Sequence, residues 1–295
     1  MGSLDGRVAI VTGAGRGIGR SVALLLASEG MPVVVNDLGG AVDGSGADAA
    51  PARLVADEIV ASGGAAVANG ADVSDHEAAQ DLIKTAIGEF GRLDVLVNAA
   101  GILRDRMVFN MTEQEWDDVI RVHLKGTFNT TKFAAAHWRE QRDESAQNRI
   151  INFTSVSGLH GNPGQPNYAA AKMGIVGLTY SAANSLAKYG VTVNAVSPGA
   201  ATRMTESIPD RRRRAGTGTG TADERSPDNV APLVAYLASE RSGWITGRIV
   251  HTAGYEVALY NNPQPVVRVV GTGPWSLDAL AAQVERSFGP MLGRS

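Results

Sequence analysis

The chain has 295 residues, of which 44% are hydrophobic and 19% charged, proportions that fit a globular protein with a large core and exclude a disordered chain. The formal net charge is only −3, so neither nucleic acid nor an anionic membrane is indicated as a partner. There is no cysteine, which rules out disulfides, thiolate metal ligands and a cysteine nucleophile. Because the sequence shows no secretory signal pattern and no apolar run of about 18 residues, we expect a cytoplasmic protein with no membrane partner.

Short β-rich segments alternate along the chain with longer segments of helical periodicity. Strands are expected at residues 7–12, 32–37, 65–71, 93–98, 149–154, 191–197 and 248–252. Helices are expected at residues 17–30, 53–62, 75–90, 112–142, 168–189 and 227–238. The strict alternation implies βαβ units, and the continuously apolar strands imply burial on both sides. We therefore predict an α/β fold with a single Rossmann-type, doubly wound parallel sheet and helices on both faces.

Three segments depart from this alternation. Residues 39–51 are rich in Gly, Ala and Asp, and we interpret them as a flexible surface loop. Residues 205–226 contain four consecutive arginines followed by alternating Gly and Thr, which is typical of a mobile, solvated segment. Residues 276–288 have the pattern of a short amphipathic helix. With no repeat and no long linker, we expect one domain over residues 1–295, with a mobile loop at about 204–228 and a C-terminal extension from about 256.

A glycine cluster at residues 12–19, with the sequence TGAGRGIG, lies between the first predicted strand and the first predicted helix. Glycine lets the backbone approach a pyrophosphate, and a helix N-terminus supplies free N–H groups. Asp37, at the end of the second strand, can bond both ribose hydroxyls and would repel the 2′-phosphate of NADP. Arg16 is a mild signal for NADP, since a basic residue here can bind a phosphate. The pattern therefore predicts a dinucleotide site that prefers NAD.

Further candidate cofactor contacts follow the third and fourth strands, because ligands of open α/β sheets bind where strands end. Asp72 and Val73 stand where an adenine amino group is read, and small residues after the fourth strand let a flat cofactor approach. The candidate cofactor-binding residues from these patterns are Gly13, Arg16, Gly17, Ile18, Gly19, Asp37, Asp72, Val73, Asn98, Ala99, Ala100 and Gly101.

Tyr168 and Lys172 lie four residues apart in a predicted helix and so share one face. A phenol has a pKa of about 10, and a neighbouring ammonium favours the phenolate. Lys172 would supply that ammonium and would also bind the nicotinamide ribose. Ser155, thirteen residues before Tyr168 at the end of a strand, would bond the substrate oxygen. These residues predict a catalytic acid/base facing the cofactor.

Taken together, these motifs resemble the short-chain dehydrogenase/reductase superfamily. The matching pieces are TGAGRGIG at 12–19, NAAG at 98–101, Ser155 with YAAAK at 168–172, and SPGAATRMT at 197–205, and they span about residues 6–254. The resemblance implies hydride transfer at nicotinamide, with Tyr168 as general acid/base, Lys172 as modifier of its pKa and Ser155 as the orienting hydroxyl. It also implies that Tyr168, Lys172, Pro198 and Gly199 contact the nicotinamide end of the cofactor. No metal site is expected, since no His/carboxylate cluster has ligand spacing.

His123 departs from the superfamily pattern, which usually has an asparagine at this position that holds a proton-relaying water. The imidazole nitrogens would serve the same relay, which makes His123 a candidate catalytic residue. Alternatively, it is a packed helix residue, and the sequence leaves both interpretations open.

A narrower resemblance, carried by NDLGG, VHLKGTF and GLHGNPGQPNYAAAK, is to the (3R)-hydroxyacyl-CoA dehydrogenase part of peroxisomal multifunctional enzyme type 2 and its bacterial relatives. It implies an NAD-dependent 3-hydroxyacyl-CoA dehydrogenase of lipid metabolism that interconverts a secondary alcohol and a ketone. The alternatives are a 17β-hydroxysteroid dehydrogenase and a 3-oxoacyl-carrier-protein reductase, the latter disfavoured by Asp37 because such reductases generally prefer NADP. A non-catalytic nucleotide-sensing scaffold is opposed by the intact Ser155, Tyr168 and Lys172.

The superfamily resemblance also implies a homotetramer formed through the long helix and the helix that carries Tyr168. Phe128, Phe133 and Trp138 on the long helix would then be interface residues. Arg211–Arg214 would attract the phosphates of coenzyme A or form a solvated charge run, and the tail would reach a neighbouring subunit or cover the substrate mouth. The sequence does not decide between these roles.

Overall fold

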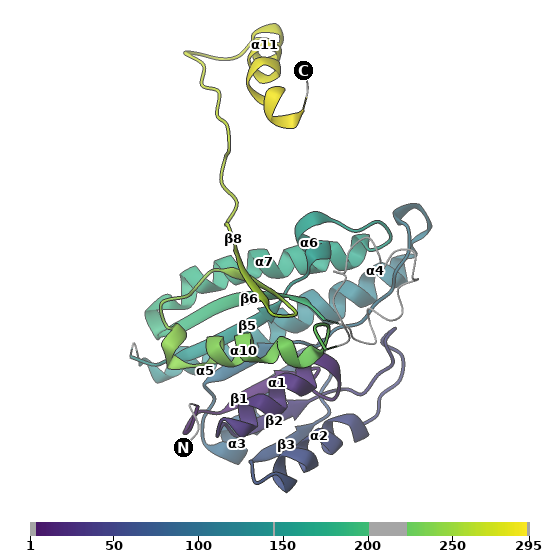
Figure 1. The fold of residues 1–295 in the computed structure, drawn as a ribbon, viewed down its shortest axis with the longest axis vertical. Helices are drawn as coiled ribbons and strands as arrows, with labels where there is room; N and C mark the ends of the chain where they lie inside the picture. The colour runs from purple at the N-terminus through teal and green to yellow at the C-terminus, as the bar shows by residue number, and fades with distance from the viewer. Residues whose placement is uncertain (1–3, 144, 201–222, 294–295) are drawn as a thin grey trace. The chain divides into compact units, whose positions relative to one another are not determined.

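In the computed structural model, which describes residues 4–143, 145–200 and 223–293, the strands form one sheet in the order β3-β2-β1-β4-β5-β6-β7-β8 (Figure 1). The strands are β1 Ala9–Thr12, β2 Val33–Asn36, β3 Ala66–Asn69, β4 Val95–Asn98, β5 Asn148–Phe153, β6 Val191–Gly199, β7 Ile249–Ala253 and β8 Glu256–Tyr260. Strands β1 to β7 pair in parallel, as predicted from the alternation of strands and helices. The last strand, β8, was not anticipated and pairs antiparallel with β7 at the edge.

Helices cover both faces of this sheet, which confirms the predicted doubly wound α/β fold (Figure 1). On one face lie α1 Gly17–Ser28, α2 Ala50–Ala61 and α10 Ala231–Ala238. On the other lie α3 His76–Phe90, α5 Gly126–Gln141 and α7 Pro166–Leu186. Successive strand residues serve opposite faces: Val11 packs with the first group and Ile10 with the second. This double burial explains why the strands are continuously apolar.

The predicted long helix at 112–142 is built from three pieces: α4 Glu113–Val119, a π-helical segment Ile120–Lys125, and α5. Thr112 caps α4 as expected, because its hydroxyl accepts the Glu115 N–H at 3.2 Å while the Glu115 carboxylate accepts the Thr112 N–H at 2.9 Å. Trp138 is a correction to the sequence interpretation. Its ring is only 1% exposed and its Nε1–H donates to the Leu93 carbonyl at 2.7 Å, so it belongs to the core and not to an interface.

Three asparagines on the α3/α5/α7 face of the sheet each bond a threonine of the helix that covers them. The pairs are Asn69 with Thr85 of α3 at 3.2 Å, Asn98 with Thr130 of α5 at 2.7 Å, and Asn152 with Thr179 of α7 at 2.9 Å. All three asparagines lie at or near the carboxyl ends of their strands, and the side chains of the two central ones also bond each other at 2.9 Å. Each pair satisfies polar groups between the sheet and a helix, buried in the pairs of α5 and α7 and half-buried in that of α3, and sets the height of one helix against the sheet.

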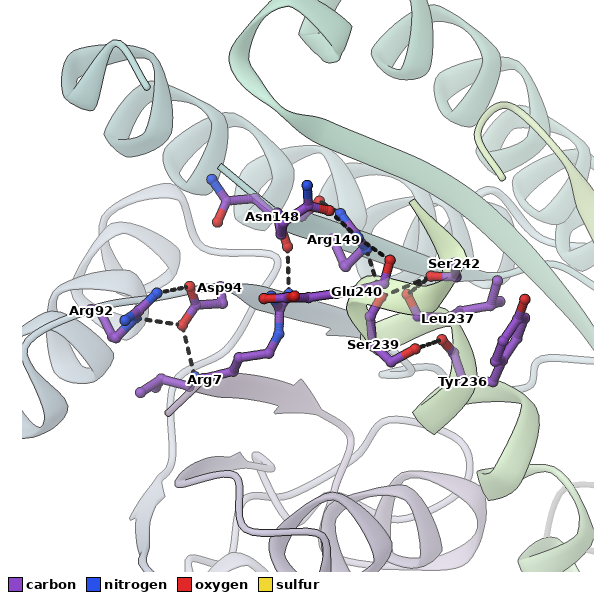
Figure 2. A network of polar contacts seen from close by, with 12 residues as sticks. Arg7, Arg92, Asp94, Asn148, Arg149, Tyr236, Leu237, Ser239, Glu240 and Ser242 are labelled. Atoms are coloured by element: carbon purple, nitrogen blue, oxygen red, sulfur yellow. Dashed lines mark hydrogen bonds and ion pairs between the residues drawn. The ribbon is translucent and has the colours of Figure 1, made fainter. Parts of the chain in front are cut away.

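The opposite, amino edge of the sheet holds a network of charged side chains (Figure 2). Arg92 forms two hydrogen bonds to Asp94, at 2.7 and 2.8 Å, and Asp94 also accepts the N–H of Val8, the residue before β1. Arg149, at the start of β5, donates to the Ser239 carbonyl at 3.1 Å. Burial, and secondarily the charge of Arg7, lowers the pKa of Arg149 to about 10. This network joins strand starts to the end of α10 and leaves the carboxyl edge free for chemistry.

The remaining helical elements are short or lie in a separate unit. They are α6 Val156–His160, the 3₁₀ turns Val108–Asn110, Ala187–Tyr189, Pro227–Asn229, Glu240–Ser242 and Pro290–Leu292, and α11 Leu277–Phe288. The chain divides into two compact units, residues 1–260 and 261–295, and α11 belongs to the second. Residues 256–260 of the expected extension form β8 in the first unit. Most of the expected mobile loop at 204–228, including Arg211–Arg214, lies outside the described residues.

No helix in the described ranges has both the length and the apolar character needed to cross a bilayer.

Candidate active site at the carboxyl edge of the sheet

The glycine loop joins β1 to α1 and touches the segment after β4. Gly13 has φ +65°, and a Cβ there would lie 2.7 Å from Ala100 Cα. A Cβ at Gly19 would lie 2.2 Å from the Gly13 carbonyl oxygen. Both positions therefore require glycine because the backbones approach so closely. The Thr12 hydroxyl accepts the N–H groups of Ala99 and Ala100 at 3.1 and 3.2 Å, which ties the two loops together.

The first turn of α1 is open toward the carboxyl edge. Arg16 at the N-cap is extended, no side chain caps the helix, and the first turn contains no acidic residue. Gly17 begins the helix and Ile18 packs against the core, so neither blocks the N–H groups. A helix N-terminus with free N–H groups is a site for an anion. The residues predicted to hold a pyrophosphate are therefore arranged in a way that fits one.

Asp37 follows β2 and faces the glycine loop. One carboxylate oxygen accepts the Gly15 N–H at 2.8 Å, and the other accepts the Gly39 N–H at 2.6 Å. A carboxylate oxygen can accept more than one hydrogen bond, so these contacts orient Asp37 and leave capacity for ribose hydroxyls. The Arg16 guanidinium donates to the Gly40 carbonyl at 3.3 Å, which engages part of this cation within the protein.

The candidates after β3 and β4 differ in burial and in what their side chains bond. Asp72 accepts hydrogen bonds from the Ser74 N–H and hydroxyl, and Arg121 lies 3.2 Å from its other oxygen. Partial burial pushes the pKa of Asp72 upward, but the hydrogen bonds from Ser74 and the charge of Arg121 hold it below its usual value. Val73 and Asn98 are buried, and the Asn98 side-chain amide is bonded to Asn152 of β5 and to Thr130 of α5.

Pro198 and Gly199 end β6 at the same edge, and a Cβ at Gly199 would lie 2.6 Å from Ala253 Cβ.

Ser155 lies at the N-cap of α6, where its hydroxyl accepts the Ser157 N–H at 3.2 Å. The short helix α6 packs on α7 through Gly158, where a Cβ would lie 2.9 Å from Lys172 Cβ. The Thr154 hydroxyl bonds the Lys172 carbonyl at 2.9 Å from the end of β5. These contacts bring Ser155 beside the first turns of α7, which carry Tyr168 and Lys172. The sequence analysis missed α6 and Gly158, since five residues are too few for a periodic signal.

Tyr168 and Lys172 lie on one face of α7, as expected from their spacing. The Lys172 ammonium is 5.5 Å from the centre of the Tyr168 ring and donates to the Phe153 carbonyl at 2.8 Å. Burial raises the pKa of Tyr168 to about 12, although hydrogen bonding by Ser155 opposes the rise. Burial also lowers the pKa of Lys172 to about 7. Because desolvation dominates, the pKa of Tyr168 lies above 10, whereas a neighbouring ammonium alone would place it below 10.

His123 is buried in the π-helical segment, a rare geometry that recurs at functional sites. Its Nε2 lies 2.8 Å from the Ile102 carbonyl oxygen and 3.0 Å from the Ile102 amide nitrogen, so either tautomer has a partner. Its ring meets the Tyr168 ring edge-on, with centres 5.1 Å apart. Among the described residues nothing bonds its Nδ1. Burial and then the charge of Lys172 lower the pKa of His123 well below 6.5, so the imidazole is neutral.

Gly101, one of the predicted cofactor contacts, also shapes the site, and so does Asn167, which the sequence analysis missed. Gly101 is required by His123, because a Cβ there would lie 2.1 Å from His123 Cε1. Asn167 is fully buried and holds the start of α7: its amide nitrogen donates to the Glu115 carbonyl at 2.8 Å, and its oxygen accepts the Tyr168 N–H at 2.8 Å. The sequence signal that could have found Asn167 is its position directly before Tyr168, the candidate acid/base. In the residues for which coordinates are described, no group of three His, Asp or Glu side chains could hold a metal.

The glycine loop, the open α1 N-terminus and the Ser155–Tyr168–Lys172 group thus meet at one edge of a doubly wound sheet. The family model described as short chain dehydrogenase matches residues 7–213. The chain belongs to the short-chain dehydrogenase family. It is an oxidoreductase that acts on CH–OH groups, and its cofactor is of the nicotinamide dinucleotide type that the family uses.

Relatives with assigned names support this placement. Over 97% of its length the chain is 42% identical to hydroxyacyl-CoA dehydrogenase ChsB1 of Mycobacterium tuberculosis, covering 89% of that protein. It is 46% identical to peroxisomal multifunctional enzyme type 2 of Drosophila melanogaster, over 87% of this chain and 40% of that one. It is 45% identical to 3-oxoacyl-[acyl-carrier-protein] reductase FabG of Staphylococcus aureus, over 83% and 96% respectively. A crystal structure of a short chain dehydrogenase from Mycobacterium avium matches with a TM-score of 0.86 and 45% identity, covering 100% of this chain and 97% of the other.

Proposed function

We propose that the protein is an NAD-dependent dehydrogenase of 3-hydroxyacyl-CoA thioesters, with Tyr168 as its acid/base. The proposal rests on one observation: Ser155, Tyr168 and Lys172 lie together at the edge of the sheet that also carries the glycine loop. Asp37 is hydrogen-bonded to that loop. Their mutual placement supplies an orienting hydroxyl, a proton carrier and a cation at the end of the sheet where a dinucleotide fits.

NAD is proposed over NADP because of Asp37. The open N–H groups at the start of α1 would hold the pyrophosphate, and Asp37 would bond the adenosine ribose. A 2′-phosphate beside this carboxylate would meet a like charge, and the guanidinium of Arg16 already donates to the Gly40 carbonyl. When bound, the cofactor supplies the hydride-accepting carbon, and Tyr168, Lys172, Pro198 and Gly199 would face its nicotinamide end.

The proton chemistry belongs to the chain itself. The Ser155 hydroxyl holds the substrate oxygen near the Tyr168 hydroxyl, which takes the alcohol proton in oxidation and returns it in reduction. Since burial raises the pKa of Tyr168 to about 12, oxidation requires a group that stabilises the phenolate, and Lys172 in its protonated form is the protein group placed to do this. We assign His123 the role of proton relay, because its ring meets the Tyr168 ring edge-on, with centres 5.1 Å apart, and its buried Nδ1 has no partner among the described residues.

The substrate class is inferred from the names of the relatives, two of which couple this family to acyl thioesters of coenzyme A or carrier protein. Asp37 favours the oxidative, NAD-linked coenzyme A reaction over the carrier-protein reductase. A 17β-hydroxysteroid dehydrogenase with the same site is the second candidate, carried over from the sequence resemblance. We further propose a homotetramer and one catalytic domain over residues 1–295 with the C-terminal part as its extension.

One assay tests the substrate proposal. NADH formation is followed in parallel with 3-hydroxyacyl-CoA thioesters of several chain lengths and with 17β-hydroxysteroids, and the reverse reaction is followed with 3-oxoacyl carrier protein and NADPH. Highest kcat/KM with a thioester of coenzyme A supports the proposal. A preference for a steroid, or for carrier protein with NADPH, would contradict it. Sedimentation of the same preparation tests the tetramer.

A further inference from the structure

The segment that joins β2 to α2, residues 38–49, is a closed, hydrogen-bonded loop that we call the strap. Its ends meet where the Asp48 N–H donates to the Leu38 carbonyl at 2.9 Å. A Cβ at Gly39 would lie 1.7 Å from the Asp48 carbonyl oxygen, so only glycine fits this junction. Two further backbone hydrogen bonds, at 2.8 and 2.9 Å, close the tip. The strap therefore has a defined structure of its own, whereas the sequence led us to expect a flexible surface loop.

The tip of the strap contacts the segment that follows β4. The Leu103 N–H donates to the Val42 carbonyl at 2.9 Å. Gly44 lies against the side chain of Ile102 so closely that a Cβ at Gly44 would be 2.9 Å from Ile102 Cδ1. Both Ile102 and Leu103 are buried. The tip is thus anchored by a backbone hydrogen bond and by apolar packing on two core residues.

The course of the strap follows from the order of the strands. Its ends lie beyond β2 and its tip lies beyond β4, while β1 lies between these two strands. The strap therefore crosses the carboxyl end of β1, where the glycine loop begins. Arg16 connects the two directly through its hydrogen bond to the Gly40 carbonyl at 3.3 Å. The strap starts one residue after Asp37, and its tip touches the chain one residue after Gly101. Both of these residues are predicted cofactor contacts.

We propose that the strap is the outer wall of the cofactor site and encloses the adenosine–pyrophosphate half of NAD against the glycine loop. The cofactor then enters and leaves only after the tip separates from residues 102–103. Ligands of doubly wound sheets lie over the strand ends at the point where the strand order reverses, which here is between β1 and β4, beneath the strap. The proposal rests on the proposed NAD dependence and adds a slow, gated exchange of the cofactor.

A disulfide between strap and core tests this directly. The chain has no cysteine, and a Cβ at Gly44 would lie 3.6 Å from Ile102 Cβ, within the range that a disulfide spans. The double variant Gly44→Cys/Ile102→Cys is prepared reduced and oxidised, and NADH binding is followed by stopped-flow fluorescence. The single variants Gly44→Cys and Ile102→Cys carry the same substitutions without the link and are measured under the same redox conditions.

If the strap gates the cofactor, oxidation before mixing slows NADH association by at least about tenfold, and oxidation after binding slows dissociation similarly. Reduction restores both rates, and the single variants do not respond. Equal rates in the oxidised and reduced double variant overturn the proposal.

A second variant keeps the proposal testable if the cysteine pair disturbs folding. Replacing residues 41–46 by two glycines shortens the strap so that its tip no longer reaches Ile102. Dissociation of NADH should then accelerate by at least about tenfold. An unchanged dissociation rate would refute the enclosure. Failure of the unmodified protein to bind NADH or NAD at all would instead refute the proposed function, so the two ideas fail separately.

Discussion

Replacing Lys172 with methionine is expected to change how the stability of the protein depends on pH. Lys172 is 5% exposed, and burial lowers its pKa from 10.5 to about 7. Below pH 7 both the folded and the unfolded chain carry this proton, and the folded state bears the full cost of the buried charge. Between pH 7 and 10.5 the unfolded chain binds the proton and the folded chain does not, so stability rises with pH.

The size of this effect follows from the two pKa values. At about 1.4 kcal/mol per pH unit, the full difference corresponds to about 5 kcal/mol. From pH 6 to pH 9 the free energy of unfolding of the native protein should increase by about 2–3 kcal/mol relative to Lys172→Met. Loss of the hydrogen bond to the Phe153 carbonyl adds a further difference between the two proteins, but that difference does not vary with pH.

Urea unfolding followed by tryptophan fluorescence at pH 6, 7.5 and 9 measures this difference at one protein concentration. Lys188→Met is the matched control, because Lys188 is exposed and the same chemical change there removes no buried charge. The control should leave the pH dependence as it is in the native protein. Parallel curves for the native protein and Lys172→Met would contradict this prediction, because they would show that burial does not hold Lys172 as a weakly basic amine.

Three further outcomes are expected. Tyr168→Phe should bind NADH normally but lose about 10²- to 10⁴-fold in turnover in oxidation and reduction alike; near-normal turnover would show that another group moves the proton. Asp37→Ala should shift the ratio of NADP to NAD affinity toward NADP by at least about tenfold, since it removes a charge near the 2′ position; titration of both cofactors checks this. Gly101→Ala should destabilise by about 1–3 kcal/mol because its methyl group meets His123, and the double variant Gly101→Ala/His123→Ala should recover part of that loss. Additive losses in the double variant would contradict this contact.

The sequence patterns predicted the parallel sheet, its two helical layers and the residues at the strand ends, because period and turn chemistry are local properties. They did not predict β8, because a short alternating edge strand resembles a loop. Trp138 was misplaced because an apolar residue on a helix fits a core and an interface equally well, and its position in space decides. The pKa of Tyr168 is raised and not lowered as expected, because desolvation depends on burial, and burial has no local signature in the sequence.

The strap illustrates a different limit. Its composition is that of a flexible segment, yet glycines at positive φ, such as Gly39 and Gly44, build tight and specific turns. What holds it is a set of contacts with residues about sixty positions later in the chain, at Ile102 and Leu103. No local sequence pattern reports such contacts, so a flexible loop and a loop anchored to the core cannot be told apart until the fold is known.

The three asparagine–threonine pairs have a consequence for how this enzyme can be altered. Each pair joins a fixed point near a strand end to one turn of a helix, so a slide of α7 by one turn, about 5.4 Å, would break the Asn152–Thr179 bond. The same slide would shift Tyr168 relative to Ser155, because Tyr168 moves with α7 while Ser155 directly follows β5. Substitutions deep in the sheet, far from any ligand, can therefore act on turnover by changing helix alignment. Searches for altered activity should include these buried polar positions together with the residues that line the site.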